Sequence, residues 1–172
     1  MPRLTSEPVD LSLVPTVLHR SADLSRDGRY RYALRRVWDP NEPAILFVGL
    51  NPSTADHRVD DPTIRRCMRF AREAGFGQLI VANLFAFRTP SPRLLRRAAD
   101  PVGPENDRWL QQLSVEASAT VAAWGNDGTF LHRDRAVLEL LRAPLCLGVT
   151  KRGQPKHPLY VPAAVRLRDL MA

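Results

Sequence analysis

The segment after the apolar run Ala44–Leu50 carries polar side chains of the kind that bind ligands. Gly49 permits a tight turn and a close approach of a ligand to the backbone. Asn51 and Ser53 then place an amide and a hydroxyl just beyond the run. Residues of these types are also common in ordinary turns. The segment from Gly49 to Asp56 therefore fits both a binding loop and a structural turn.

A second polar side chain interrupts an apolar strand pattern. Asn83 stands near the end of Gln78–Phe85, which is otherwise apolar from Leu79 onward. Burying an amide without partners costs about 1–3 kcal/mol, so Asn83 either bonds to neighbouring backbone or faces a pocket. Its position near the strand end favours the pocket. Arg88 follows it and is expected to reach the same rim.

A basic segment lies near the end of the chain. Thr150–Tyr160 contains three cations and one histidine, namely Lys151, Arg152, Lys156 and His157. Such a cluster is often only a solvated surface. Two prolines and a glycine among the charges favour a shaped loop instead, and His157 is the histidine that we expect to act. By contrast, Trp124–Gly128 is interpreted as a turn that caps the next helix.

Regular elements must position these segments. Four apolar runs predict buried strands at Ala44–Leu50, Gln78–Phe85, Thr120–Trp124 and Pro144–Val149. Apolar residues at helical spacing predict helices at Pro62–Ala74, Pro92–Ala99, Pro104–Ala117, Thr129–Arg142 and Ala163–Leu170. Alternating strands and helices predict an α/β fold with a central, mostly parallel four-stranded sheet covered on both faces. Ligands bind at the carboxyl ends of such strands, where the polar segments lie.

An N-terminal β-hairpin is expected to precede this sheet. Thr16–Arg20 and Arg29–Trp38 are β-type runs joined through Asp27-Gly28, a strong hairpin signal. Alternation puts Tyr30, Tyr32, Leu34 and Arg36 on one face, and Arg29, Arg31, Ala33 and Arg35 on the other. One face of the hairpin is therefore expected to be exposed to water.

The composition is that of one globular domain. The chain has 172 residues, 44% of them hydrophobic, so residues 1–172 are expected to form a single domain with residues 1–15 as a loose lead-in. A net charge of +7 favours nucleic acid or nucleotide as the partner. No apolar run approaches the length of about 18 residues that a membrane helix needs. Cys67 and Cys146 are interpreted as buried reduced thiols, which suits a cytoplasmic protein. We expect a monomer without metal or cofactor.

The polar segments, in their order, resemble motifs of the uracil-DNA glycosylase superfamily. Gly49-Leu50-Asn51-Pro52-Ser53 looks like its first motif, and Val81–Arg88 looks like the second strand of the family-four enzymes, whose Asn recognises the base. His157-Pro158-Leu159 resembles the start of the final His-Pro-Ser-Pro motif. More closely, Gly49–Arg65, Asn83–Pro90 and Thr150–Tyr160 resemble a bacterial family, domain of unknown function 1643. The superfamily resemblance implies a three-layer αβα sandwich.

This resemblance implies hydrolysis of the bond between a base, an unusual or modified one, and its sugar. Asn83 would pair with the base, His157 would donate to the departing base, and Asn51 or Asp56 would orient water. The implied substrate-binding residues also include Gly49, Ser53, Phe85, Phe87 and Arg88, and the implied phosphate-binding residues are Lys151, Arg152 and Lys156. The Asp-Pro-Tyr of the best-known enzymes is absent.

Two other functions remain open at this point. The same pocket would serve a module that binds a nucleotide or modified base without chemistry. A metal-dependent hydrolase would instead use the acids and histidine of the first loop, which are Asp56, His57, Asp60 and Asp61.

Overall fold

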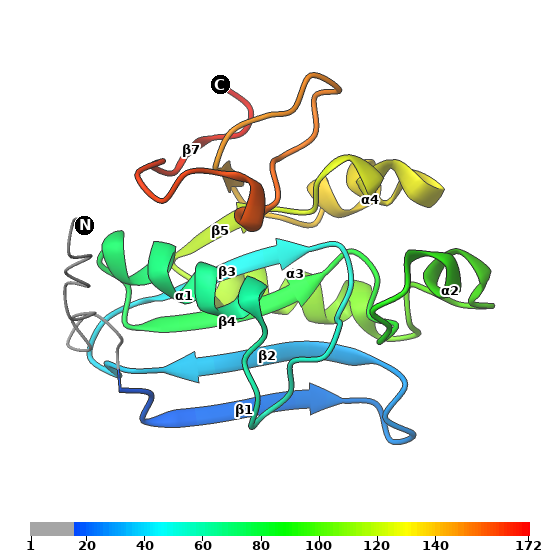
Figure 1. Cartoon of the computed structure of the whole chain (residues 1–172), viewed down its shortest axis with the longest axis horizontal. Coiled ribbons are helices and arrows are strands. Elements are labelled where there is room, and N and C mark those ends of the chain that lie inside the picture. Colours follow the sequence, from blue (N-terminus) through cyan, green and yellow to red (C-terminus); the bar gives the residue numbers. More distant parts are fainter. Residues whose placement is uncertain (1–15) are drawn as a thin grey trace, which may run out of the picture.

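The fold is built on a mixed β-sheet. The computed structural model describes residues 16–172, and within them the sheet has seven strands in the order β1-β2-β4-β3-β5-β6-β7 (Figure 1). The expected lead-in, residues 1–15, lies outside the described residues.

Four parallel strands form the centre of this sheet. They are β3 (Ala44–Gly49), β4 (Gln78–Asn83), β5 (Ala119–Ala122) and β6 (Leu145–Cys146). The prediction that the four apolar runs share one sheet is confirmed. Because β3 lies between β4 and β5, the order of the strands along the chain reverses beside β3. Sheets of this kind form a ligand-binding crevice at such a reversal, outside the carboxyl ends of the strands.

Antiparallel strands extend the sheet at both edges. The predicted hairpin is present as β1 (His19–Leu24) and β2 (Arg31–Val37), and β2 also pairs with β4. At the other edge β7 (Arg168–Asp169) pairs with β6. The expected four-stranded sheet is therefore too small, since the hairpin and the final segment join it.

The helix predicted at Ala163–Leu170 is wrong, because this segment contains β7 instead. Val165 and Leu167 both pack against the same core. A spacing of two residues suits an extended chain, in which alternate side chains share a face. The apolar residues of this segment fit both periods, so the sequence pattern alone was ambiguous.

A bulge in β2 breaks the alternation expected for the hairpin. Ala33 lies opposite Asp23 on β1, but the next pair joins Arg31 with Leu24, so Tyr32 has no opposite residue. A bulge of this type adds one residue to one strand and redirects the side chains beyond it. Arg31 therefore no longer shares the face of Ala33.

Both faces of β2 are buried, so the prediction of a water-exposed face is wrong. Arg31 is 3% exposed and Arg36 is 0% exposed. Both side chains donate to carbonyl groups of the loop after β3, Arg31 to Ala55 and Arg36 to Asp56. β2 therefore supports that loop instead of facing solvent.

Helices cover the two faces of the sheet (Figure 1). α1 (Pro62–Glu73) packs on one face, which we call the α1 face. Asp61 caps it by accepting from the amide of Ile64, and Pro62 occupies its first turn. The opposite face, which we call the α3 face, is covered by α2 (Pro92–Arg97), α3 (Asn106–Glu116) and α4 (Arg133–Leu138).

The helix predicted at Thr129–Arg142 is shorter than expected. A 3-10 segment, η2 (Asn126–His132), precedes α4. Leu131 and His132 both have positive φ angles, of 53° and 54°, which interrupt the helix between the two pieces. Leu131, an apolar residue of the predicted helix, is 56% exposed. No helix within residues 16–172 is long and apolar enough to cross a membrane.

Candidate functional site

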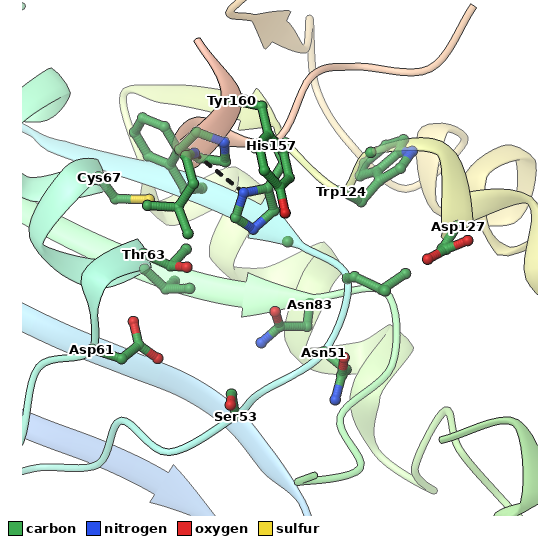
Figure 2. A pocket seen from close by; sticks show the side chains of 18 of the residues that line it. Asn51, Ser53, Asp61, Thr63, Cys67, Asn83, Trp124, Asp127, His157 and Tyr160 are labelled. Carbon is green, nitrogen blue, oxygen red and sulfur yellow. Dashed lines mark hydrogen bonds between the residues drawn. The ribbon is translucent and has the colours of Figure 1, made fainter. Parts of the chain in front are cut away.

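A cavity of about 680 Å³ lies on the α1 face, at the carboxyl ends of β3, β4 and β5. We call it the pocket. Its apolar lining comes from the sheet and from α1, and includes Phe47, Ile64, Cys67, Val81 and Ala123. Polar side chains from several loops surround the same space (Figure 2). The pocket therefore combines an apolar floor with polar groups at its walls, as small-molecule sites do.

Asn83, at the end of β4, lines the pocket with an unused donor. The residue is 4% exposed, and its Nδ2 has no hydrogen-bond partner among the described residues. Gly49 lies opposite it on β3, and a Cβ added at Gly49 would lie 2.9 Å from Asn83 Oδ1. Because Gly49 has no side chain, the amide of Asn83 can occupy this space. A ligand in the pocket can accept from Nδ2.

Asn51 and Ser53 also line the pocket, but the amide nitrogen of Asn51 is already used. Asn51 Nδ2 lies 3.0 Å from the carbonyl oxygen of Pro52, 3.3 Å from that of Phe87 and 2.8 Å from that of Thr89. These bonds fix the loop after β3 against the loop after β4. Only Oδ1 of Asn51 remains to contact a ligand or a water molecule.

His157 reaches the pocket from the segment after β6 (Figure 2). Its Nδ1 accepts from the amide of Leu159 at 3.2 Å. In the neutral ring the proton must therefore sit on Nε2, which makes Nε2 a donor. Burial lowers the pKa of His157, and the charge of Asp61 opposes that shift. The pocket thus contains a neutral imidazole donor at pH 7.

Asp61 is a carboxylate in the pocket that the glycosylase interpretation did not include. Its Oδ1 caps α1 through the amide of Ile64, at 2.9 Å. The Cys67 thiol lies in the same lining, but burial raises its pKa above the ordinary range, so it is unsuited to act as a nucleophile. Asp61 therefore supplies a carboxylate acceptor to the pocket from the start of α1.

The segment Trp124–Gly128, interpreted from the sequence as a turn, forms another wall. Trp124 Nε1 donates to Gln154 Oε1 at 2.9 Å. A Cβ added at Gly128 would lie 2.1 Å from the Trp124 ring, so only glycine fits beneath it. Asn126 and Asp127 line the pocket beside the indole. The paired glycines were the signal in the sequence, because one of them makes room for a buried aromatic ring.

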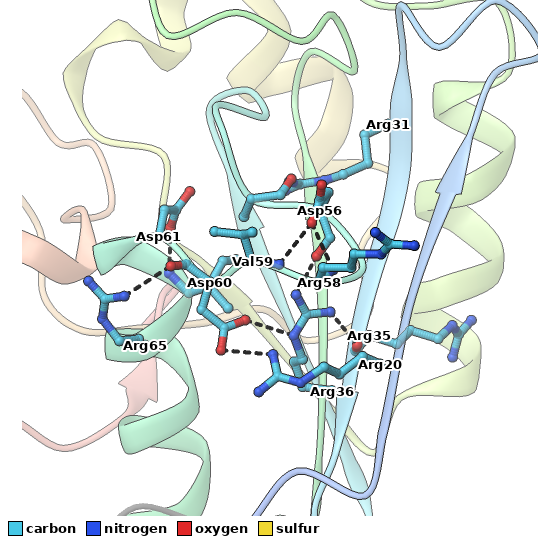
Figure 3. A network of polar contacts seen from close by, with 12 residues as sticks. Arg20, Arg31, Arg35, Arg36, Asp56, Arg58, Val59, Asp60, Asp61 and Arg65 are labelled. Atoms are coloured by element: carbon cyan, nitrogen blue, oxygen red, sulfur yellow. Dashed lines mark hydrogen bonds and ion pairs between the residues drawn. The ribbon is translucent and has the colours of Figure 1, made fainter.

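Arg31 also lines the pocket, although the hairpin pattern placed it elsewhere. It belongs to a group of arginines that hold the loop after β3 (Figure 3). Arg31 Nη1 donates to the carbonyl of Ala55 at 2.6 Å. Arg36 Nε pairs with Asp60 at 2.8 Å, and Arg20 pairs with the same carboxylate at 3.0 Å. The bulge in β2 and this network were not visible in the sequence.

Four of the residues predicted to act on substrate lie outside the pocket lining. Phe85 is fully buried on the α3 face and packs against Phe130, and Phe87 packs against Tyr30. Arg88 donates to the carbonyl of Gly28 at 3.1 Å. Asp56 accepts from the amides of Arg58 and Val59, which hold its pKa below the usual range. These four residues support neighbouring structure.

The basic segment is divided by the structure. Lys156 lines the pocket together with Thr150, whereas Lys151 and Arg152 are exposed and lie outside the lining. Thr150 Oγ1 donates to Asn126 Oδ1 at 2.6 Å, which joins this segment to the Trp124 wall. Tyr160, 82% exposed, stands at the edge of the pocket with its ring near that of His157.

The residues considered for a metal site are used in other ways. Asp60 pairs with two arginines, Asp61 caps α1, and the Nε2 atom of His57 accepts from Arg58. In the described part of the chain, no group of three or more histidine, cysteine or acidic residues is arranged to hold a metal ion.

The comparisons with known proteins identify a family. The model of the family described as "Protein of unknown function (DUF1643)" matches residues 31–159, and the chain belongs to this family. No curated protein and no solved structure matches the chain. The matched span contains every predicted site residue, from Gly49 to His157.

Proposed function

We propose that this member of the DUF1643 family binds a nucleobase in the pocket and hydrolyses the bond between that base and its sugar. The observation that carries the proposal is the amide of Asn83. A buried donor without a partner costs about 1–3 kcal/mol, so a bound ligand that accepts from it recovers that energy. An asparagine amide presents a donor and an acceptor side by side, as the edge of a nucleobase does.

The neighbouring groups suit the steps of such a hydrolysis. A water molecule attacks the anomeric carbon while the base leaves with the electrons of the glycosidic bond, through a state with oxocarbenium character. The Nε2–H of His157 can donate to the departing base and stabilise its negative charge. Oδ1 of Asn51 can orient the water, and the carboxylate of Asp61 can accept its proton.

The resemblance to the uracil-DNA glycosylase superfamily supports the same reaction. It also implies that the domain is a three-layer αβα sandwich. The Asp-Pro-Tyr motif of the best-known enzymes in that superfamily is absent here, so another residue must accept the proton of the water molecule. An amide such as that of Asn51 can orient water but cannot accept a proton. Asp56, the other predicted candidate, is held by backbone amides outside the pocket. In this proposal the proton therefore passes to Asp61.

A binding module without chemistry is the second candidate. It is favoured by the bonds of Asn51 Nδ2 to three backbone carbonyls, which leave this residue a structural role. Such a module would need the recognition by Asn83 but neither Asp61 nor His157.

The test is base release. Purified protein is incubated with nucleosides, nucleotides and oligonucleotides that carry common, deaminated and alkylated bases, and free base and abasic sites are measured. Hydrolysis that falls by about 100-fold or more in both Asn83→Asp and Asp61→Asn supports the proposal. Binding of a panel member without base release favours the module, and neither binding nor release rejects both.

A further inference from the structure

Arg31 is a buried cation that the proposed hydrolysis does not use. It lines the pocket and is 3% exposed. None of the ion pairs found within residues 16–172 includes it. Its Nη1 donates to the Ala55 carbonyl, but its Nε has no partner among those residues. An ion in this position costs several kcal/mol of desolvation, which one carbonyl does not offset.

The fold delivers this cation to the pocket in a specific way. Regular alternation along β2 would point Arg31 to the α3 face with Ala33, and the bulge at Tyr32 turns it to the α1 face. Bulges beside functional sites commonly redirect one side chain. Burial lowers the pKa of Arg31 to about 10, so the side chain is still charged at pH 7.

Two buried donors in one pocket define the ligand further. Arg31 Nε and Asn83 Nδ2 both lack acceptors in the described structure. One is charged, so the complementary ligand carries an anionic oxygen as well as a neutral acceptor. Asp61 is the main source of favourable charge for Arg31, but it caps α1 and forms no ion pair with it among residues 16–172.

We propose that Arg31 binds a phosphate of the ligand inside the pocket, and that the substrate is therefore a free nucleotide. This inference rests on the proposed recognition of a nucleobase. A volume of about 680 Å³ falls in the range of sites that enclose a small molecule, which suits a base together with its sugar phosphate. The phosphates of a polymer would lie outside, beside the exposed Lys151 and Arg152.

The experiment compares nucleosides with their 5′-monophosphates by titration calorimetry. For wild-type protein we expect monophosphates to bind about 10- to 100-fold more tightly than the matching nucleosides, the usual strength of a hydrogen bond to a charged group. In Arg31→Gln this ratio should fall to about one. Arg20→Gln is the matched control, because Arg20 lies in the same hairpin, pairs with Asp60 and does not line the pocket.

Equal affinity of wild-type protein for nucleosides and monophosphates overturns the inference and leaves the recognition of a base intact, as does a preference that persists in Arg31→Gln. Tighter binding of a single-stranded oligonucleotide than of any monophosphate overturns the free-nucleotide substrate. The wild-type measurements do not depend on how the variant folds.

Inorganic phosphate separates this inference from the proposed function. If no nucleoside or nucleotide binds, the recognition of a nucleobase fails. An increase of the melting temperature of wild-type protein by inorganic phosphate, absent in Arg31→Gln, would then still support an anion site at Arg31. No increase overturns that site as well.

Discussion

Two buried pairs of arginine and asparagine flank the carboxyl end of β4, one on each face of the sheet. On the α3 face, Asn106 Nδ2 donates to the carbonyls of Asn83 and Leu84, and Arg133 donates to the same Leu84 carbonyl and to Asp107. On the α1 face, Arg31 and the side chain of Asn83 line the pocket, and each has a donor without a partner in the described structure.

The buried polar residues on the two faces of the sheet serve different roles. Arg133 and Asn106 use their donors to satisfy the irregular backbone after β4, and only Oδ1 of Asn106 lacks a partner within the described chain. Arg31 and Asn83 are buried to a similar degree, but both line the pocket and each has a donor without a partner in the described structure. Each face thus carries a buried arginine and a buried asparagine. The unsatisfied donors, together with the pocket, distinguish a ligand site from a structural clamp.

The arginines should give the largest contrast in stability. Arg133→Met should lower the free energy of unfolding by about 3 kcal/mol, because it removes charge-assisted bonds to Leu84 and Asp107. Arg31→Met should cost less, about 1 kcal/mol, because it removes one bond to the Ala55 carbonyl but also a poorly paired buried ion, whose replacement by an apolar side chain is often neutral. Urea unfolding measures both. Equal losses would mean that Arg31 is also a structural clamp.

Substitutions of the two asparagines should change the free energy of unfolding in opposite directions. Asn106→Leu should lower the free energy of unfolding by about 2 kcal/mol, because two backbone carbonyls lose a donor. Asn83→Leu should raise it by about 1 kcal/mol, because the unpartnered Nδ2 is removed. Thermal or urea unfolding of the two variants is sufficient. Destabilisation by Asn83→Leu would show that the amide is satisfied and not held ready for a ligand.

This comparison also shows what the sequence could and could not predict. Asn83 was recognisable because an amide in an apolar strand demands an explanation, and the central strands were recognisable as continuous apolar runs. Arg31 was not, because its position depends on a bulge that no local residue type announces. The wall at Trp124 was missed since glycine and asparagine serve turns and pockets alike. The roles of Arg31 and of the Trp124 wall depend on contacts with segments that are distant in the sequence.

The space beside Gly49 gives a smaller, more specific effect. Gly49→Ala should weaken ligand binding by about tenfold, because the added Cβ would lie 2.9 Å from Asn83 Oδ1 and displace the amide. The same substitution in an Asn83→Ala background should change the remaining affinity little. Calorimetry on the double-mutant cycle measures this coupling. Additive effects of the two substitutions would contradict a direct contact.

His157 should make the stability of the protein depend on pH. Burial, opposed by the charge of Asp61, lowers its pKa in the folded protein, so the unfolded chain binds the proton first as pH falls. Its contribution is present above about pH 6.5, the ordinary value for histidine, and is lost below it. Wild type should therefore lose more stability between pH 7.5 and pH 5.5 than His157→Gln does. His57→Gln, in an exposed loop, is the control and should follow wild type.

The exposed cations should show the smallest effect, and they test whether charge acts inside or outside the pocket. Lys151→Gln combined with Arg152→Gln should leave the affinity for a monophosphate within about twofold of wild type, because neither residue lines the pocket. Lys156→Gln should weaken it by about three- to tenfold, since Lys156 does line it.

Titration of an oligonucleotide at several salt concentrations tests the alternative, in which the exposed cations bind phosphates outside the pocket. If phosphates outside the pocket bind Lys151 and Arg152, the double variant should reduce the log–log salt slope by about 0.7 for each phosphate of the single strand that it no longer binds. That reduction, together with weaker oligonucleotide binding, would favour a polymer that runs over the surface. An unchanged slope places the selective charge at Arg31 and Lys156, because buried or partly buried cations are screened less by salt than exposed ones.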